Sequence, residues 1–252
     1  MDADPENGEG LSTEFNVSTY IQENEFPLNF SKRVIYLNAR SDEVNNAITT
    51  LRSISPTVTG LFLEYLLEGT MICKYNLNVS IYSFEAFGDN VFKRWCESKS
   101  YSYGRVIRML FTTNSIHSNE DIIIYTFYKT FVTLNNFNGD IETIATIADS
   151  PEVITIINYF THELIPQLNI RDEVTFEPGF LTVRGQYALR SNPDFIIDGN
   201  VIDMKVASQH KWMQWARQLY LYSEGMRQNG YGVNKCYILN VLSNILVEYS
   251  FY

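Results

Sequence analysis

The sequence predicts an α/β fold in which a small mixed sheet, flanked by helices, carries a helical insertion. Three observations support this class. Apolar residues recur at helical spacing over 44–75 and 140–164. A β-rich stretch from Phe195 to Lys205 is interrupted by Asp198-Gly199, a strong hairpin signal. An amphipathic segment at 208–228 then precedes a last β-rich run, so helices and strands share one domain.

In the first half, residues 44–54 (VNNAITTLRSI) predict a helix that ends before Pro56. Residues 57–59 (TVT) are then placed to cap a second helix starting at Gly60. Residues 77–135 are mixed, the cluster NNFNGD at 135–140 predicts a turn, and 140–164 predicts a helix ending near Pro166.

In the second half, residues 174–189 (VTFEPGFLTVRGQYAL) predict one or two strands around a Pro178-Gly179 turn. The 195–205 hairpin follows. Ser208 is the expected N-cap of the helix to Gln228, and one closing strand over 235–252 is expected to complete the sheet. We therefore expect a flexible acidic N-terminus at 1–12 and a single domain at 13–252. Within this domain, residues of about 40–170 are expected to be helical, and residues of about 171–252 to form the sheet and the last helix.

The hairpin brings charges together. If Asp198 and Gly199 form a two-residue loop, Ile197 pairs with Asn200 and Phe195 with Ile202, so Asp194 comes opposite Asp203. Directly opposed side chains have Cβ atoms roughly 4.5–5.5 Å apart. Lys205 lies two residues beyond Asp203 and shares its face of the strand.

Two opposed carboxylates repel each other, so something must offset the repulsion. Either one carboxyl is protonated, or Lys205 neutralises the pair, or a divalent cation lies between the two acids. Mg²⁺ typically binds one or two carboxylates together with waters and substrate phosphates. A lysine beside such a cation suits phosphodiester hydrolysis, whereas a solvated surface hairpin is the alternative that needs no chemistry.

Pro193-Asp194 followed by Asp203-Met204-Lys205 resembles the signature of the PD-(D/E)XK nuclease superfamily. Gln218 and Tyr222 in the next helix resemble the Gln-x-x-x-Tyr pattern of the RecB and lambda-exonuclease branch. The resemblance implies a restriction-endonuclease-like core. It also implies that Asp194 and Asp203 hold Mg²⁺ or Mn²⁺ with the backbone carbonyl of Met204 or Val206, that Lys205 acts on the attacking water, and that Gln218 and Tyr222 position the scissile phosphate.

The same branch carries a further metal ligand on an upstream helix. Glu64, four residues after Gly60, matches that position, and Glu68 is the competing candidate one turn later. Glu177, on the strand before the first aspartate, is a candidate for a supporting role. Trp212 and Trp215 are expected to pack in the core.

The resemblance implies a metal-dependent deoxyribonuclease, an exonuclease in DNA recombination, repair or processing, acting on duplex ends or single strands. A homo-oligomer or a recombination partner protein would be compatible with it. A catalytically inactive nuclease-fold module that binds DNA, or has a structural role in a viral assembly, is the alternative. The abundance of Asn, Ile and Tyr is typical of proteins from AT-rich genomes, including phage and viral ones.

Composition sets limits on these functions. The chain of 252 residues is 45% hydrophobic and 19% charged, as in soluble globular proteins. No apolar run reaches the roughly 18–20 residues that cross a bilayer, and the acidic start lacks signal-peptide character, so a cytoplasmic protein is expected. The three widely spaced cysteines favour neither disulfides nor a four-cysteine cluster. The net charge of −10 requires any DNA-binding surface to be local.

Overall fold

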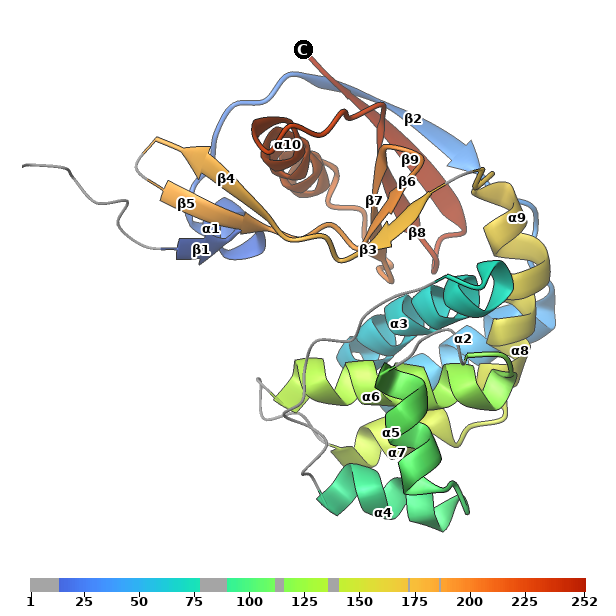
Figure 1. The fold of residues 1–252 in the computed structure, drawn as a ribbon. Coiled ribbons are helices and arrows are strands. Elements are labelled where there is room, and N and C mark those ends of the chain that lie inside the picture. Colours follow the sequence, from blue (N-terminus) through green and yellow to red (C-terminus); the bar gives the residue numbers. More distant parts are fainter. Residues whose placement is uncertain (1–13, 78–89, 112–115, 136–140, 172, 186) are drawn as a thin grey trace, which may run out of the picture. The chain divides into compact units, whose positions relative to one another are not determined.

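The computed structural model describes residues 14–77, 90–111, 116–135, 141–171, 173–185 and 187–252 (Figure 1). The predicted acidic N-terminus at 1–12, and the predicted turn at 135–140 apart from Asn135, lie outside them. The chain forms two compact units: a sheet unit from residues 1–37 and 170–252, and a helical unit from residues 38–169.

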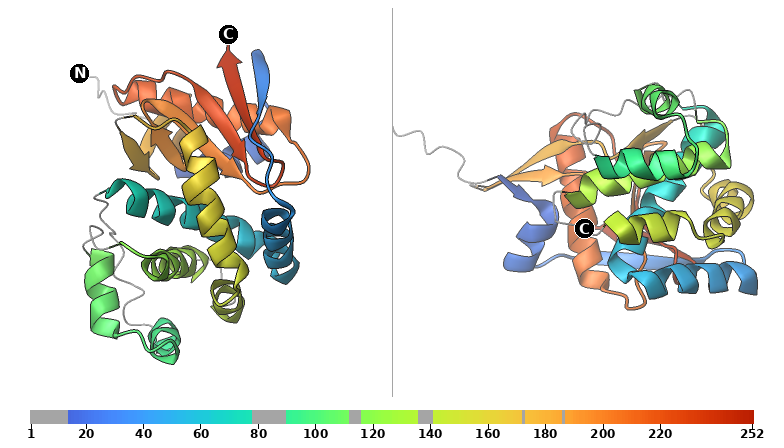
Figure 2. Two further views of the ribbon diagram at one scale, coloured as in Figure 1. Left: turned by 90° about the vertical axis from the view of Figure 1, so that its right-hand side faces the viewer. Right: turned by 90° about the horizontal axis from the view of Figure 1, so that it is seen from below.

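The sheet unit contains a six-stranded sheet with the order β2-β9-β8-β7-β6-β3. Only β7 and β8 run parallel among these pairs, so the sheet is mostly antiparallel, and the mixed α/β class is confirmed. In Figure 2, β2 lies beside β9, and β2 forms one edge of the sheet. The strands are β2 (Phe30–Tyr36), β3 (Val174–Phe176), β6 (Phe195–Ile197), β7 (Asn200–Lys205), β8 (Cys236–Asn240) and β9 (Ile245–Phe251).

The predicted β6–β7 hairpin is confirmed in its register. Asp198 and Gly199 form the two-residue loop with φ of 50° and 75°, and Phe195 pairs with Ile202. Positive φ at both positions is what this type of turn requires, and the Asp-Gly dipeptide tolerates it. The Asp198 carboxylate also accepts hydrogen bonds from the backbone N–H groups of Arg171 (2.8 Å) and Glu173 (2.9 Å), which ties the turn to the chain that leads into β3.

The segment predicted as strands around Pro178-Gly179 takes a different course. Strands β3 and β4 (Phe180–Arg184) do not pair with each other, because β3 pairs with β6 and β4 pairs with β5 (Tyr187–Ser191). The two strand pairs, β3–β6 and β4–β5, form one long hairpin with a bend between them. The register of the pairing is the same on both sides of the bend. Pro178 and Pro193 lie in that bend and have no N–H to donate, which explains why the ladder is interrupted there. The outer half, with the short strand β1 (Glu14–Asn16), forms a second sheet of order β1-β5-β4.

Helix α10 (Trp212–Gln228) packs against the six-stranded sheet, β4 and α1 (Val17–Glu23). The prediction that Ser208 caps this helix is wrong: the N-cap is Lys211 and makes no side-chain capping bond. The expected single closing strand is also wrong, since β8 and β9 form a hairpin. The core of this unit gathers around Val201, Leu219, Ile238 and Val247, each fully buried.

The β2 strand was missed by the sequence analysis, which placed the sheet after residue 171. Its residues FSKRVIY include three consecutive polar residues, Ser31 to Arg33, which hide the alternation of a half-buried strand. Only pairing with β9 reveals that Phe30 and Val34 face the core.

The described part of the helical unit contains α2 (Asp42–Ile54), α3 (Pro56–Tyr75), α4 (Asn90–Ser98), α5 (Tyr103–Phe111), α6 (Asn119–Asn135), α7 (Ile141–Ala148), α8 (Glu152–Tyr159), the π-helical turn η3 (Phe160–Leu164) and α9 (Ile165–Gln167). None of the helices described is long and apolar enough to cross a membrane.

Two boundaries differ from the predictions. The cap of α3 is Ser55, whose Oγ accepts the Val58 N–H, and Pro56 begins the helix where its missing N–H costs nothing. The helix predicted over 140–164 is broken at Pro151 and continues to Gln167. The wider turn η3 accommodates Pro166, which cannot donate to the carbonyl one turn earlier.

Candidate active site

Asp194 and Asp203 lie side by side at the end of the β6–β7 ladder. Asp194 directly precedes β6, and its Oδ2 accepts a hydrogen bond from the backbone N–H of Met204 at 2.6 Å. Asp203 is the residue that follows the Phe195–Ile202 pair on β7. The structure therefore brings together the two acids that the hairpin register predicted.

Asp203 is the more deeply buried of the pair. Its side chain is 1% exposed, and its Oδ2 forms an ion pair with Nζ of Lys205, whose side chain is 24% exposed. This oxygen accepts no hydrogen bond of ordinary geometry within the described part of the chain. Lys205 thus bridges the buried carboxylate and the solvent.

Gln218 and Tyr222 complete the surroundings of Asp203 from α10. Nε2 of Gln218 donates to Asp203 Oδ1 at 3.2 Å and to the Tyr222 hydroxyl at 2.7 Å. Both side chains are buried, Gln218 at 8% and Tyr222 at 5% exposed. The sequence placed these two residues on one helical face, but the contact of Gln218 with Asp203 was missed, because it depends on the packing of α10 against β7.

The environment raises the pKa of both carboxyls. Burial, followed by the neighbouring charge of Asp203, holds the pKa of Asp194 well above its usual range, and the Lys205 ammonium and the Met204 N–H oppose this effect. Burial also raises the pKa of Asp203, against the lowering effect of Lys205. A second positive charge at the pair would relieve both effects.

Replacing Asp194 by asparagine should therefore stabilise the metal-free protein above neutral pH. A carboxyl whose pKa is raised by folding contributes stability that is present below its unfolded pKa, about 3.9, and is lost as the pH rises through the folded pKa. Asparagine removes the charge and keeps an oxygen for the Met204 N–H. We expect a melting temperature at pH 8 that is higher by a few degrees, in line with roughly 1 kcal/mol. Thermal unfolding in EDTA from pH 4 to pH 8 tests this, and equal pH slopes for variant and wild type would contradict it.

Glu177 lies next to Asp194 at the bend of the long hairpin. Its backbone has a φ of 41°, in the left-handed region, and its N–H donates to the Asp194 carbonyl at 3.0 Å. The Glu177 charge also contributes to the raised pKa of Asp194. The structure thus places this candidate at the site, although the sequence assigned it only a supporting role.

Glu64 and Glu68 lie on α3, which belongs to the helical unit, whereas Asp194 and Asp203 belong to the sheet unit. Glu68 is 2% exposed and is held inside its own unit, where it accepts a 2.5 Å hydrogen bond from the Tyr125 hydroxyl and lies 3.8 Å from Lys129 Nζ. Glu64 is partly exposed. Glu68 is therefore engaged in contacts within the helical unit.

The aspartate pair is compatible with a bound Mg²⁺ or Mn²⁺. The donor set is two adjacent carboxylates, and hard cations prefer such oxygens. The Met204 carbonyl leaves the strand on the same side as its N–H, toward Asp194, whereas the Lys205 carbonyl is bonded to Val241 N–H. Val206 lies beyond the strand, so Met204 is the better placed of the two carbonyl candidates. Within the described residues no cluster of three or more His, Cys, Asp or Glu side chains forms a metal site, and two carboxylates leave room for water and phosphate ligands.

Basic side chains around α10 are partly engaged within the protein. Arg184 forms an ion pair with Glu224 at 3.0 Å, and Arg217 Nε donates to the Phe26 carbonyl at 3.1 Å. Lys211 is exposed beside the start of α10. Trp215 is buried, and Trp212 packs against the same core, as predicted.

Comparisons of the chain with protein-family models, curated proteins and solved structures found no match.

Proposed function

We propose that this protein is a divalent-metal-dependent nuclease that hydrolyses DNA phosphodiester bonds, with a sheet unit that resembles a restriction-endonuclease-like core. One observation carries the proposal. Two adjacent aspartates with raised pKa, a lysine paired to the buried one and a glutamine from the following helix converge at one end of a β-hairpin. Perturbed carboxyls beside a lysine are characteristic of catalytic sites.

Each residue has a distinct task in this proposal. Gln218, which also donates to the Tyr222 hydroxyl, holds the Asp203 carboxylate in one orientation, and the Met204 N–H holds that of Asp194. Lys205, which reaches solvent beside Asp203, orients the attacking water and offsets the charge that develops on the phosphate. A bound Mg²⁺ would supply Lewis-acid polarisation of the phosphate and a lower pKa for its water. The resemblance to the lambda-exonuclease branch favours DNA and exonucleolytic cleavage.

The direct test is cleavage of end-labelled linear DNA, in duplex and single-stranded form, with Mg²⁺ or Mn²⁺ and with EDTA. We expect cleavage that needs the cation and falls about 100-fold or more in Lys205→Met. The matched control is Lys235→Met, which removes an exposed lysine of the same unit whose partner is Glu248. No cleavage with either cation, or undiminished cleavage by Lys205→Met, would overturn the proposal.

A catalytically inactive DNA-binding or structural module is the second candidate. Two observations favour it: the Asp203–Lys205 ion pair already neutralises one acid, and the net charge is −10. This candidate predicts no cleavage under any condition above and DNA binding that is unchanged in Asp194→Asn. The same electrophoretic assay, run with a mobility-shift arm, separates the two.

A further inference from the structure

Strand β4 is an edge strand of the three-stranded sheet. It pairs with β5 on one side, and the polar backbone groups of alternate residues point to the other side. Leu181 and Val183 are the residues whose N–H and C=O groups point outward. Such a row of outward groups is a template for pairing with another strand.

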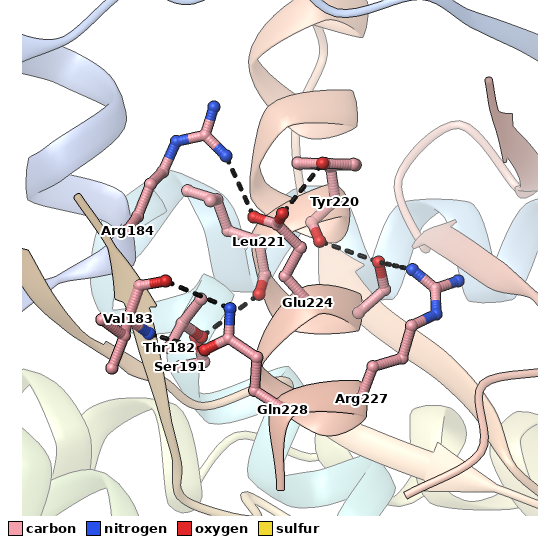
Figure 3. Close-up of polar contacts among 10 residues, drawn as sticks. Thr182, Val183, Arg184, Ser191, Tyr220, Leu221, Glu224, Arg227 and Gln228 are labelled. Atoms are coloured by element: carbon pink, nitrogen blue, oxygen red, sulfur yellow. Dashed lines mark hydrogen bonds and ion pairs between the residues drawn. The ribbon is translucent and has the colours of Figure 1, made fainter. Parts of the chain in front are cut away.

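Side-chain amides at the end of α10 occupy this edge. Gln228 Oε1 accepts the Val183 N–H at 2.7 Å, and its Nε2 donates to the Val183 carbonyl at 3.1 Å (Figure 3). Asn229 Nδ2 donates to the Leu181 carbonyl at 3.0 Å. Three of the four outward groups are thus bonded, and the Gln228 amide reproduces the pair of bonds that a neighbouring strand would make.

Close packing of α10 on β4 lets these amides reach the edge. A Cβ atom on Gly225 would lie 2.4 Å from Thr182 Oγ1, so only glycine permits this approach. Thr182 Oγ1 lies 2.5 Å from Ser191 Oγ (Figure 3). Arg184 of β4 pairs with Glu224, which lies one helical turn before Gln228. The last turns of α10 are therefore held directly over the strand.

The other edge strands have different protection. β2 carries exposed Lys32 and Arg33, and charged residues on an edge disfavour pairing. β1 and β3 have only three residues each. By contrast, the outer positions of β4 are apolar, with Leu181 45% and Val183 46% exposed. Without the amides, β4 would be an unprotected apolar edge.

We propose that β4 is a latent self-association edge, which Gln228 and Asn229 keep closed against a second copy of this chain. The edge is self-complementary: in a two-fold antiparallel pair, Leu181 of one copy faces Val183 of the other, and all four outward groups of each strand find partners. The exposed side chains of the same two residues then pack across the strands. No charged side chain of β4 opposes this, because Arg184 is directed to Glu224.

The test is the molar mass of Gln228→Ala by size-exclusion chromatography with light scattering. Alanine is a better helix former than glutamine, so the end of α10 is not weakened by the change itself. We expect a mass that rises toward the dimer between about 10 µM and 1 mM, the range of weak association. The control variant Gln209→Ala removes an exposed glutamine that is not one of the two amides bonded to the β4 edge. Wild type and Gln209→Ala should have equal masses at each concentration.

A second variant makes the interpretation specific. Gln228→Ala combined with Val183→Lys restores no hydrogen bond but puts a charge on the edge, and it should return the mass to that of wild type. Hydrogen exchange of the Val183 amide gives a readout if Gln228→Ala is poorly folded: it should become faster than in wild type when dilute and slower again when concentrated. A Gln228→Ala protein with the wild-type mass at every concentration, or association that Val183→Lys leaves intact, would overturn the proposal.

Discussion

Replacing Asp203 by asparagine is expected to abolish metal-dependent DNA cleavage while leaving the fold intact. The amide oxygen can still accept from Gln218, as Asp203 Oδ1 does at 3.2 Å, so α10 keeps its contact. The negative charge is lost from the most buried position of the site, which removes both the proposed cation ligand and the ion partner of Lys205. We expect a loss on the order of 10³-fold in cleavage rate, comparable to the loss of a preorganised electrostatic contact.

Two measurements make this expectation specific. The control variant Glu248→Gln removes a carboxylate from β9 of the same unit, where it contacts Lys235 and Tyr237, and should cleave like wild type. Titration with Mn²⁺, followed by the melting temperature, should show stabilisation of wild type that Asp203→Asn lacks, because ligand binding to the folded state raises stability. An Asp203→Asn protein that retains cleavage would exclude Asp203 from the reaction.

The second large effect is expected in stability. Gly225→Ala places a Cβ 2.4 Å from Thr182 Oγ1 and 3.2 Å from Ser191 Oγ, two groups that are fully buried on adjacent strands. Relief requires α10 to move away from β4. Overpacking of this kind costs about 3 kcal/mol, of which the better helix propensity of alanine returns about 1 kcal/mol.

Gly232→Ala is the matched control, since a Cβ there meets nothing within 4 Å. Urea unfolding should show a lower midpoint for Gly225→Ala and an unchanged one for Gly232→Ala. Because Gln218 and Gly225 lie on the same helix, cleavage should also fall in Gly225→Ala. Equal midpoints for the two variants would show that β4 can shift to accept the methyl group.

Local signals explain what could be predicted from the sequence. The Asp198-Gly199 turn fixes the register by itself, and the register brings Asp194 beside Asp203 without any knowledge of the rest of the chain. Helix α10 was visible from its periodicity. Its start was not, because Lys211 makes no side-chain cap and so leaves no sequence signal.

Long-range contacts explain what could not be predicted. The bend between β3 and β4 separates two sheets, and both halves read as ordinary strand in the sequence. The burial of Gln218 against Asp203 and the bonds from Gln228 to Val183 join residues that are 15 and 45 positions apart. The sequence alone names no protein partner for these glutamines, whereas tertiary packing gives them partners within the protein.

The pairing of β2 with β9 has a consequence for the order of folding. The Ser31 and Tyr252 hydroxyls, 2.7 Å apart, belong to residues separated by 221 positions in the chain. The β2 segment can pair only once the residues of β9, more than 200 positions later in the chain, have been synthesised. Contacts this distant in sequence slow folding, since loop closure precedes any gain from pairing. Lys32 and Arg33 would keep the β2 segment soluble before it pairs, and the pairing of β2 with β9 is expected to complete the sheet last.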